Sequence, residues 1–337
     1  MRATAAAGAA ASLGPWLIGC DRRPRMNLYI WSDYLAPETV PDFERETGIR
    51  VVVDTYESNE EMAAKLLAGA QGYDVIVPSG YIIPSLVGAG LLLEIPHGAL
   101  SNLGNVAPMF RLPTANPYPG FVVPYQWGMS GIAWRRDKVP SPPDTWGVFL
   151  DPAHAGRMTM MDDGREVFGA MLRFRGHSIN STDPGQLEQA KADAITARPN
   201  LLAFVSAPVK GQLVAGDVWI AQMWDGDAAQ ARMAAPEVEF LVPREGSSIW
   251  TDFLAIPGNA PNVAEALRFV DYILRPEVGA AIAAATGYGS ANAAATALMT
   301  APVPYPSAAE MERLEFARDL GAATELVDRL WTEVKAG

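Results

Sequence analysis

Residues 27–78 read NLYIWSDYLAPETVPDFERETGIRVVVDTYESNEEMAAKLLAGAQGYDVIVP, and short apolar runs alternate in them with amphipathic segments. The apolar runs at 27–31, 49–54 and 74–77 predict three strands. Residues 37–47, closed by Gly48, predict a helix, and the capping-box spacing of Ser58 and Glu61 predicts a second helix up to Leu67. Strands that alternate with helices predict an α/β fold with a parallel sheet covered by helices.

Aromatic and acidic residues follow the first and third of these strands. Trp31-Ser32-Asp33-Tyr34 comes directly after the first strand, and Ser79 and Tyr81 come after the third. Ligands of parallel sheets bind outside the carboxyl ends of the strands, so these residues are candidates for a site.

The same combination of rings and acids recurs downstream, at Asp163 with Glu166, Trp224 with Asp227, Trp250 with Asp252, and finally Tyr288. For any one pair, a packed ring and a solvated acid is the better interpretation. All of them together favour a cleft between two lobes that binds a hydrophobic cation, because carboxylates neutralise an ammonium group and ring faces attract it.

Composition restricts the classes of partner. A chain of 337 residues with 49% hydrophobic residues can bury a sizeable core and is long enough for two domains. The 26 basic and 38 acidic residues give a net charge of -12, which argues against a nucleic-acid partner and favours a cationic one. After the N-terminus, no run reaches the roughly 18 apolar residues of a transmembrane helix.

The N-terminus predicts an export signal. Arg2 precedes an Ala-rich stretch that ends in Leu17-Ile18-Gly19-Cys20, which resembles a bacterial lipoprotein processing site. We therefore expect a signal peptide at 1–19, a lipid on Cys20 and a linker at 20–26. The alternative is an unpaired or buried cysteine. As Cys20 is the only cysteine, no disulfide is expected.

The pattern changes beyond the first hundred residues. Stretches rich in Pro and Gly at 113–124 and 140–147 interrupt it, and a second lobe is expected to start near 127–133. Further strands are predicted at 157–161 and 253–257, a helix at 264–274, and two helices between 308 and 335.

The ordered motifs together resemble the spermidine/putrescine-binding proteins, the extracytoplasmic substrate-binding subunits of polyamine ABC transporters. The resemblance runs from Leu28 to about Gly337 and rests on WSDY (31–34), TYESNE (55–60), VPS (77–79), PYQWG (124–128), DDGREVF (162–168), LAIP (254–257) and TGY (286–288).

This resemblance implies a two-lobed periplasmic-binding-protein fold with a hinged interlobe cleft. Lobe 1 would take 27–127 and 254–300, and lobe 2 would take 128–253 and 301–337. It also implies delivery of a polyamine to ABC permease subunits and a periplasmic location, and no cofactor or metal is expected. The predicted lipid on Cys20 would anchor the protein, and Asp21 after it resembles an inner-membrane retention signal. The implied ligand contacts are Trp31, Ser32, Asp33, Tyr34, Ser79, Tyr81, Asp163, Glu166, Trp224, Asp227, Trp250, Asp252 and Tyr288.

The choice between the two polyamines stays open at this stage. Ser32, Asp33 and Asp227 look like the putrescine-preferring branch, whereas Tyr81, Asp163 and Trp250 look like the spermidine-preferring branch. The extra acid and the extra ring favour a third amine, and hence spermidine.

Neighbouring residues of the same types are expected to have structural roles. We expect Trp127 and Trp134 to pack near the crossing segments, and Arg165 to orient the acids beside it. Asp162 and Asp225 are expected to face solvent or to cap structure.

Other functions explain the pattern less well. An enzyme is disfavoured because the chain has no Gly-x-Ser-x-Gly elbow or phosphate-binding loop, and its three histidines, His97, His154 and His177, lack metal-ligand spacing. A binding subunit for another organic cation and a polyamine sensor that signals to a membrane partner remain as alternatives.

Overall fold

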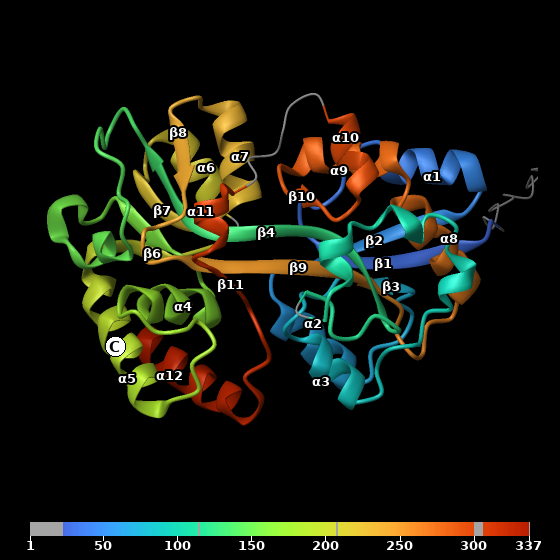
Figure 1. The fold of residues 1–337 in the computed structure, drawn as a ribbon, viewed down its shortest axis with the longest axis horizontal. Coiled ribbons are helices and arrows are strands. Elements are labelled where there is room, and N and C mark those ends of the chain that lie inside the picture. Colours follow the sequence, from blue (N-terminus) through green and yellow to red (C-terminus); the bar gives the residue numbers. More distant parts are fainter. Residues whose placement is uncertain (1–22, 114, 207, 300–305, 337) are drawn as a thin grey trace, which may run out of the picture.

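The structure is a computed structural model that describes residues 23–113, 115–206, 208–299 and 306–336. The predicted signal peptide and the predicted lipidation site at Cys20 lie outside the described residues. Within these ranges the chain forms two α/β lobes side by side, with long strands running between them (Figure 1).

The first lobe begins as predicted, with parallel strands that alternate with helices. Its N-terminal elements are β1 (Arg25–Trp31), α1 (Thr39–Thr47), β2 (Arg50–Tyr56), α2 (Asn59–Leu67), β3 (Val75–Ile76) and α3 (Ile83–Gly88). Strand β1 pairs in parallel with both β2 and β3. Gly48 ends α1 with φ 72°, a left-handed conformation that favours glycine. Ser58 caps α2 by accepting a hydrogen bond from the Glu61 backbone N–H.

Two long strands cross from one lobe to the other. Strand β4 (Val122–Arg135) is buried along its whole length, and β9 (Ser247–Ala255) lies antiparallel to its first part. From Ser130 onwards, β4 pairs instead with β7 (Ile220–Trp224). Among the described residues, the main strand order is β2-β1-β3-β9-β4-β7-β5-β6.

The second lobe is built on the far half of β4. Its elements are β5 (Met158–Met160), α4 (Gly164–Phe174), α5 (Pro184–Ala197), β6 (Leu201–Phe204), α6 (Val209–Ala215), α7 (Asp225–Ala234), β8 (Val238–Leu241) and α12 (Thr324–Ala336). The chain returns to the first lobe through β9 and forms α8 (Val263–Ile273), α9 (Pro276–Thr286), β10 (Gly289–Ser290) and α10 (Ala293–Leu298). Helix α11 (Ala308–Met311) and strand β11 (Leu314–Phe316), which pairs with β9, precede α12.

Short 3-10 helices occupy several connections: His97–Ala99, Leu103–Asn105, Pro108–Arg111, Trp146–Leu150, Pro152–His154, Arg198–Asn200 and Gly321–Ala323. Among the described residues, no helix is both long enough and apolar enough to cross a membrane.

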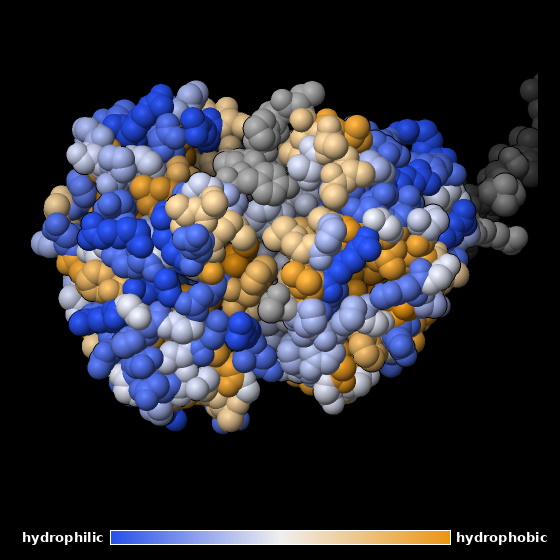
Figure 2. Space-filling view, viewed as in Figure 1, coloured by the Kyte–Doolittle hydropathy of each residue, from blue (hydrophilic) through white to orange (hydrophobic). Residues whose placement is uncertain are grey.

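Apolar side chains form separate cores on either side of the crossing strands. One large cluster includes Leu28, Phe43 and Phe269 from the first lobe, and another includes Trp146, Phe168 and Leu330 from the second. Figure 2 shows that the outline of the molecule is notched between the lobes, on the side of α3 and α12. The core packing is therefore largely a property of each lobe, and the crossing strands tie the two together.

Two predictions about the chain path need correction. The segment 113–124 was expected to be an irregular interruption, but β4 already begins at Val122. The strand expected at 253–257 begins six residues earlier, at Ser247. Both strands are buried on both faces and so lack the alternation that reveals a half-exposed strand. The two helices predicted for 308–335 are present, but β11 separates them.

Candidate functional site

All thirteen residues predicted to contact a ligand line one cavity between the lobes, together with Glu57, Asn59, Lys210 and Ala317. The thirteen come from the ends of β1, β3 and β7, from the starts of α4 and α7, from β9 and from the turn before β10. The connections after the parallel strands deliver most of them, as expected for a parallel sheet.

Asp252 is the most fully enclosed of the acids in the cavity, with 4% of its surface exposed. Its two carboxylate oxygens accept hydrogen bonds from Ser79 Oγ at 2.6 Å and from Tyr34 Oη at 2.9 Å. The Tyr125 hydroxyl donates to the carbonyl of Tyr34 at 2.6 Å. Burial raises the pKa of Asp252 to about 7, although the two hydrogen bonds oppose the rise.

Asp163 and Glu166 place a second acidic group at the start of α4. Asp163 is the N-cap residue, and its Oδ1 accepts from the backbone N–H groups of Arg165 and Glu166. Ser248 Oγ lies 3.2 Å from Glu166 Oε2. Burial, and then the neighbouring Asp163 carboxylate, raise the pKa of Glu166 to about 7. Burial also raises the pKa of Asp163.

Aromatic rings from both lobes form the walls. Trp31 of the first lobe and Trp224 of the second meet edge to face, with ring centroids 6.2 Å apart. Tyr288 meets Tyr34 at 5.3 Å and Trp250 at 5.4 Å. Such walls suit methylene chains and cations alike, because ring faces are apolar and carry negative partial charge.

Glycines allow these rings to come close. A Cβ atom on Gly226 would lie 2.3 Å from the Tyr288 ring, and one on Gly128 would lie 2.5 Å from Asp225 Oδ1 and 2.6 Å from the Trp250 ring. Both contacts are far below ordinary van der Waals distances, so the geometry of the site depends on these two residues having no side chain.

Of the four lining residues that were not among the thirteen predicted contacts, Lys210 is the cationic one. Its Nζ lies 3.0 Å from Asp33 Oδ2 and 3.3 Å from Asp227 Oδ1. Asp33 itself has φ 53°, a left-handed conformation that is uncommon for a residue with a side chain. Lys210 stands alone in a Pro-Val-Lys-Gly sequence, without a motif, so only its place on α6 reveals the contact.

The expectations for the neighbouring residues are mostly confirmed. Trp127 and Trp134 are buried, each in the core of a different lobe, and Asp162 is exposed. The prediction that Arg165 orients the neighbouring acids is supported for Asp163, because the Arg165 backbone N–H donates to Asp163 Oδ1 and the positive charge of Arg165 opposes the rise in the pKa of Asp163. Its guanidinium donates to the carbonyl of Arg318 and lies 5.6 Å from the ring centre of Tyr81.

Asp225 was predicted either to face solvent or to cap structure, and the first of these alternatives is wrong. Asp225 is buried, and its Oδ1 accepts from the backbone N–H of Met129 at 3.1 Å. Burial raises its pKa to about 7, although it is the first residue of α7, where acids are common on exposed surfaces. The close packing of β4 against α7, which the sequence pattern does not show, encloses it.

We expect Asp225→Asn to stabilise the protein at high pH. Because the folded pKa is raised above the unfolded value, ionisation of Asp225 destabilises the fold progressively from about pH 4 to pH 7. The melting temperature of the variant should exceed that of the wild type by at least about 2 °C at pH 8, the shift that roughly 1 kcal/mol produces. The difference should shrink as the pH falls towards 4. Asp162→Asn, which changes an exposed acid, is the control, and an equal gain for both variants would contradict the explanation.

Known proteins show the same fold. Residues 38–312 match the family described as bacterial extracellular solute-binding protein. The chain belongs to this family. The solute-binding protein is 35% identical to the spermidine/putrescine-binding periplasmic protein of Escherichia coli over 339 residues, which cover 98% of this chain and 97% of the relative. It is 35% identical to the putrescine-binding periplasmic protein PotF of the same species, with 93% of this chain and 91% of the relative covered.

Solved structures agree with the sequence relatives. The crystal structure of the TpPotD lipoprotein of Treponema pallidum superposes on this solute-binding protein with a TM-score of 0.84 and 31% identity, covering 92% of this chain and 99% of the other. The predictions of the family and of the two-lobed α/β fold are thereby confirmed. The matched family consists of binding proteins, so the prediction that the chain is not an enzyme is also confirmed.

Proposed function

We propose that this solute-binding protein captures a polyamine in the interlobe cavity and delivers it to the permease subunits of an ABC transporter. The observation that carries the proposal is the charge of the cavity. Five predicted contact residues are acids, Asp33, Asp163, Glu166, Asp227 and Asp252, whereas Lys210 is the single cationic residue among those that line the cavity in the described ranges.

Polyamine chemistry matches this lining. Amines of the lysine type have a pKa of about 10.4 and are charged at neutral pH. Burying such a charge costs several kcal/mol unless an acid compensates it, and burial has already raised the pKa values of Asp252 and Glu166 to about 7. An ammonium group and an enclosed carboxylate therefore stabilise each other, and the rings of Trp31, Trp224 and Trp250 can cover the methylene chain between the charges.

Calorimetric titration of the protein starting after Cys20, with spermidine and putrescine, tests the proposal, and lysine serves as a simple cationic control. We expect micromolar or tighter binding of at least one polyamine, which corresponds to about -8 kcal/mol, and much weaker binding of lysine. Folded protein that binds neither polyamine would disprove the proposal.

We also expect polyamine affinity to rise with pH. A ligand ammonium binds the ionised forms of Asp252 and Glu166, and with pKa values of about 7 both are largely protonated at pH 5.5. Affinity should be at least about tenfold lower at pH 5.5 than at pH 8, since one group with a pKa of 7 is only a few per cent ionised at pH 5.5.

Titrations in buffers of different ionisation enthalpy check the origin of this pH dependence. Near pH 6.5 binding should release protons, and Asp252→Asn should release fewer of them. A flat pH profile, or an unchanged proton count in the variant, would show that these acids do not pair with the ligand.

The remaining parts of the proposal concern anchoring and motion. We propose that Cys20 carries a lipid that holds the protein at the outer face of the inner membrane, which the description of TpPotD as a lipoprotein supports. The lobe boundaries at 27–127 with 254–300, and at 128–253 with 301–337, remain predictions. Hinge closure about β4 and β9 would present the loaded form to the permease.

A further inference from the structure

The ammonium group of Lys210 lies at the wall of the cavity, where it is surrounded by oxygen atoms. Its three N–H groups have three oxygen partners: Asp33 Oδ2 at 3.0 Å, Asp227 Oδ1 at 3.3 Å and Gln230 Oε1 at 3.0 Å. An ammonium group has three donors, so these contacts use its full capacity. Asp33 belongs to the first lobe and Asp227 to the second, and the lysine therefore bridges the cleft.

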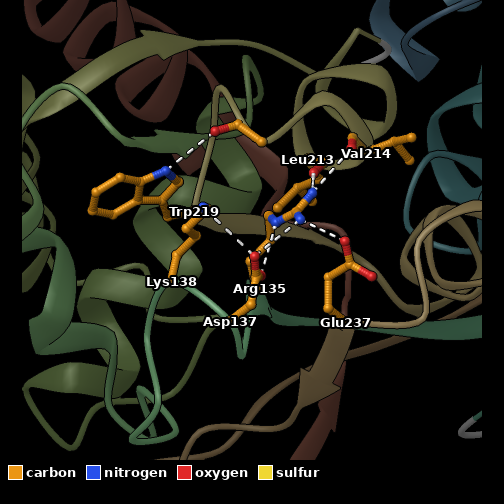
Figure 3. Close-up of polar contacts among 8 residues, drawn as sticks. Arg135, Asp137, Lys138, Leu213, Val214, Trp219 and Glu237 are labelled. Carbon is orange, nitrogen blue, oxygen red and sulfur yellow. Dashed lines mark hydrogen bonds and ion pairs between the residues drawn. The ribbon is translucent and has the colours of Figure 1, made fainter.

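The helix that carries Lys210 is held firmly in place. Arg135, at the end of β4, donates from Nη1 to the carbonyls of Leu213 at 2.8 Å and Val214 at 2.9 Å, which lie in the last turn of α6 (Figure 3). The same guanidinium is paired with Asp137 and Glu237. Nine-tenths of the Arg135 side chain is buried. The position of the Lys210 backbone thus follows from the core of the second lobe.

The partners of Lys210 are also fixed from outside the cavity. Gln230, on α7, donates from Nε2 to the carbonyl of Thr286 in the first lobe at 2.7 Å. Asp33 is held at φ 53°, which directs the chain after β1 through a tight turn. Although burial alone would lower the pKa of Lys210, Asp227 and Asp33 outweigh it and the pKa lies above its usual value. The lysine is therefore charged over the whole physiological range.

The other acids of the cavity are in a different situation. Asp252 accepts its hydrogen bonds from the hydroxyls of Ser79 and Tyr34, Glu166 accepts from Ser248, and Asp163 accepts from backbone N–H groups. The donors to Asp252 and Glu166 are neutral and do not cancel the charge of a carboxylate, whereas the nearby positive charge of Arg165 partly opposes the effect of burial on the pKa of Asp163. At one end of the cavity Asp33 and Asp227 thus already share the ammonium group of Lys210, whereas Asp252 and Glu166 accept hydrogen bonds from neutral donors.

We propose that Lys210 takes the place of one ligand ammonium, so that the cavity accepts a polyamine with two positive charges. If the ligand has a third nitrogen-containing group, that group lies next to Lys210 and is uncharged. Diamines and triamines with one acylated end have this chemistry. The assignment rests on the proposed polyamine-binding function. It competes with the interpretation that Asp163 and Trp250 provide for a third amine, because a third ammonium at Asp33 and Asp227 would meet the like charge of Lys210.

A comparison of spermidine with its two monoacetyl derivatives, acetylated at one or the other terminal nitrogen, tests the assignment by calorimetric titration. We expect the wild type to bind at least one derivative within about threefold of spermidine, because the acetylated nitrogen carries no charge. In Lys210→Met the acids Asp33 and Asp227 lack their cation, and spermidine should be favoured over the same derivative by at least about tenfold.

Lys191→Met is the matched control. Lys191 lies in the second lobe, its side chain is 19% exposed against 20% for Lys210, and it pairs with Glu188 and Glu333 away from the cavity. This variant should keep the wild-type ratio of affinities. Lys210→Gln, which removes the charge but keeps a polar end, serves as a second variant if Lys210→Met does not fold.

Two results would overturn the assignment: a wild type that binds both derivatives more than tenfold more weakly than spermidine, or a folded Lys210 variant with an unchanged ratio. A wild type that binds neither spermidine nor putrescine nor the derivatives would instead disprove the proposed function, and the assignment with it. The ratio of the affinities for spermidine and for the derivative, measured in one protein, separates these cases. A general loss of affinity affects both ligands equally and leaves this ratio unchanged.

Discussion

Asp252→Asn should weaken polyamine binding at least tenfold. The asparagine keeps the shape of the side chain and an oxygen to accept from Ser79 or Tyr34, but it carries no charge to compensate a buried ammonium. Removing one partner of an enclosed, hydrogen-bonded charge pair typically costs about 2–5 kcal/mol. Calorimetric titration at pH 7.5 measures the loss directly.

The melting temperature separates a loss of binding from a loss of folding in this variant. Since burial raises the pKa of Asp252 to about 7, the ionised carboxylate destabilises the empty protein, and the melting temperature of the variant should equal or exceed that of the wild type. Asp193→Asn is the control, because Asp193 is also a buried acid but pairs with Arg175 on the surface of the second lobe. Unchanged affinity in Asp252→Asn would remove Asp252 from the ligand contacts.

Gly226→Ala should reduce polyamine affinity to a similar extent through packing alone. The added Cβ would lie 2.3 Å and 2.4 Å from two carbon atoms of the Tyr288 ring, which belongs to the opposite lobe. The ring has little room to move, because Tyr34 and Trp250 pack against it. Relief therefore requires a shift of Tyr288 or a slight opening of the cleft, and overpacking of this kind costs about 1–3 kcal/mol.

A second glycine to alanine substitution isolates the packing effect. Gly88 is the last residue of helix α3, and a Cβ on it would meet no atom within 4 Å. Gly88→Ala should leave affinity unchanged, whereas Gly226→Ala should lose at least about tenfold, measured by the same titration. If Gly226→Ala bound as tightly as the wild type, the Tyr288 ring could not be a rigid wall of the ligand site.

The sequence predicted the first part of the fold well because its signals are local. Gly48 ends α1 and Ser58 caps α2, as the capping rules require, and β1 to β3 are parallel as the alternation of strands and helices implies. Strands β4 and β9 were predicted less well. They are buried along most of their length, and a buried strand shows no alternation of polar and apolar residues.

The sequence by itself determined the class of protein, the excess of acids over bases, and the thirteen rings, hydroxyls and acids that line the cavity, since strand ends and motifs mark them along the chain. Only the tertiary structure decided which acids are buried and which of them pair with a cationic side chain. Burial of Asp225 depends on β4 packing against α7, and the contact of Lys210 with Asp33 joins residues 177 positions apart. Burial and ion pairing depend on distances in space, and local periodicity carries no information about distances between lobes.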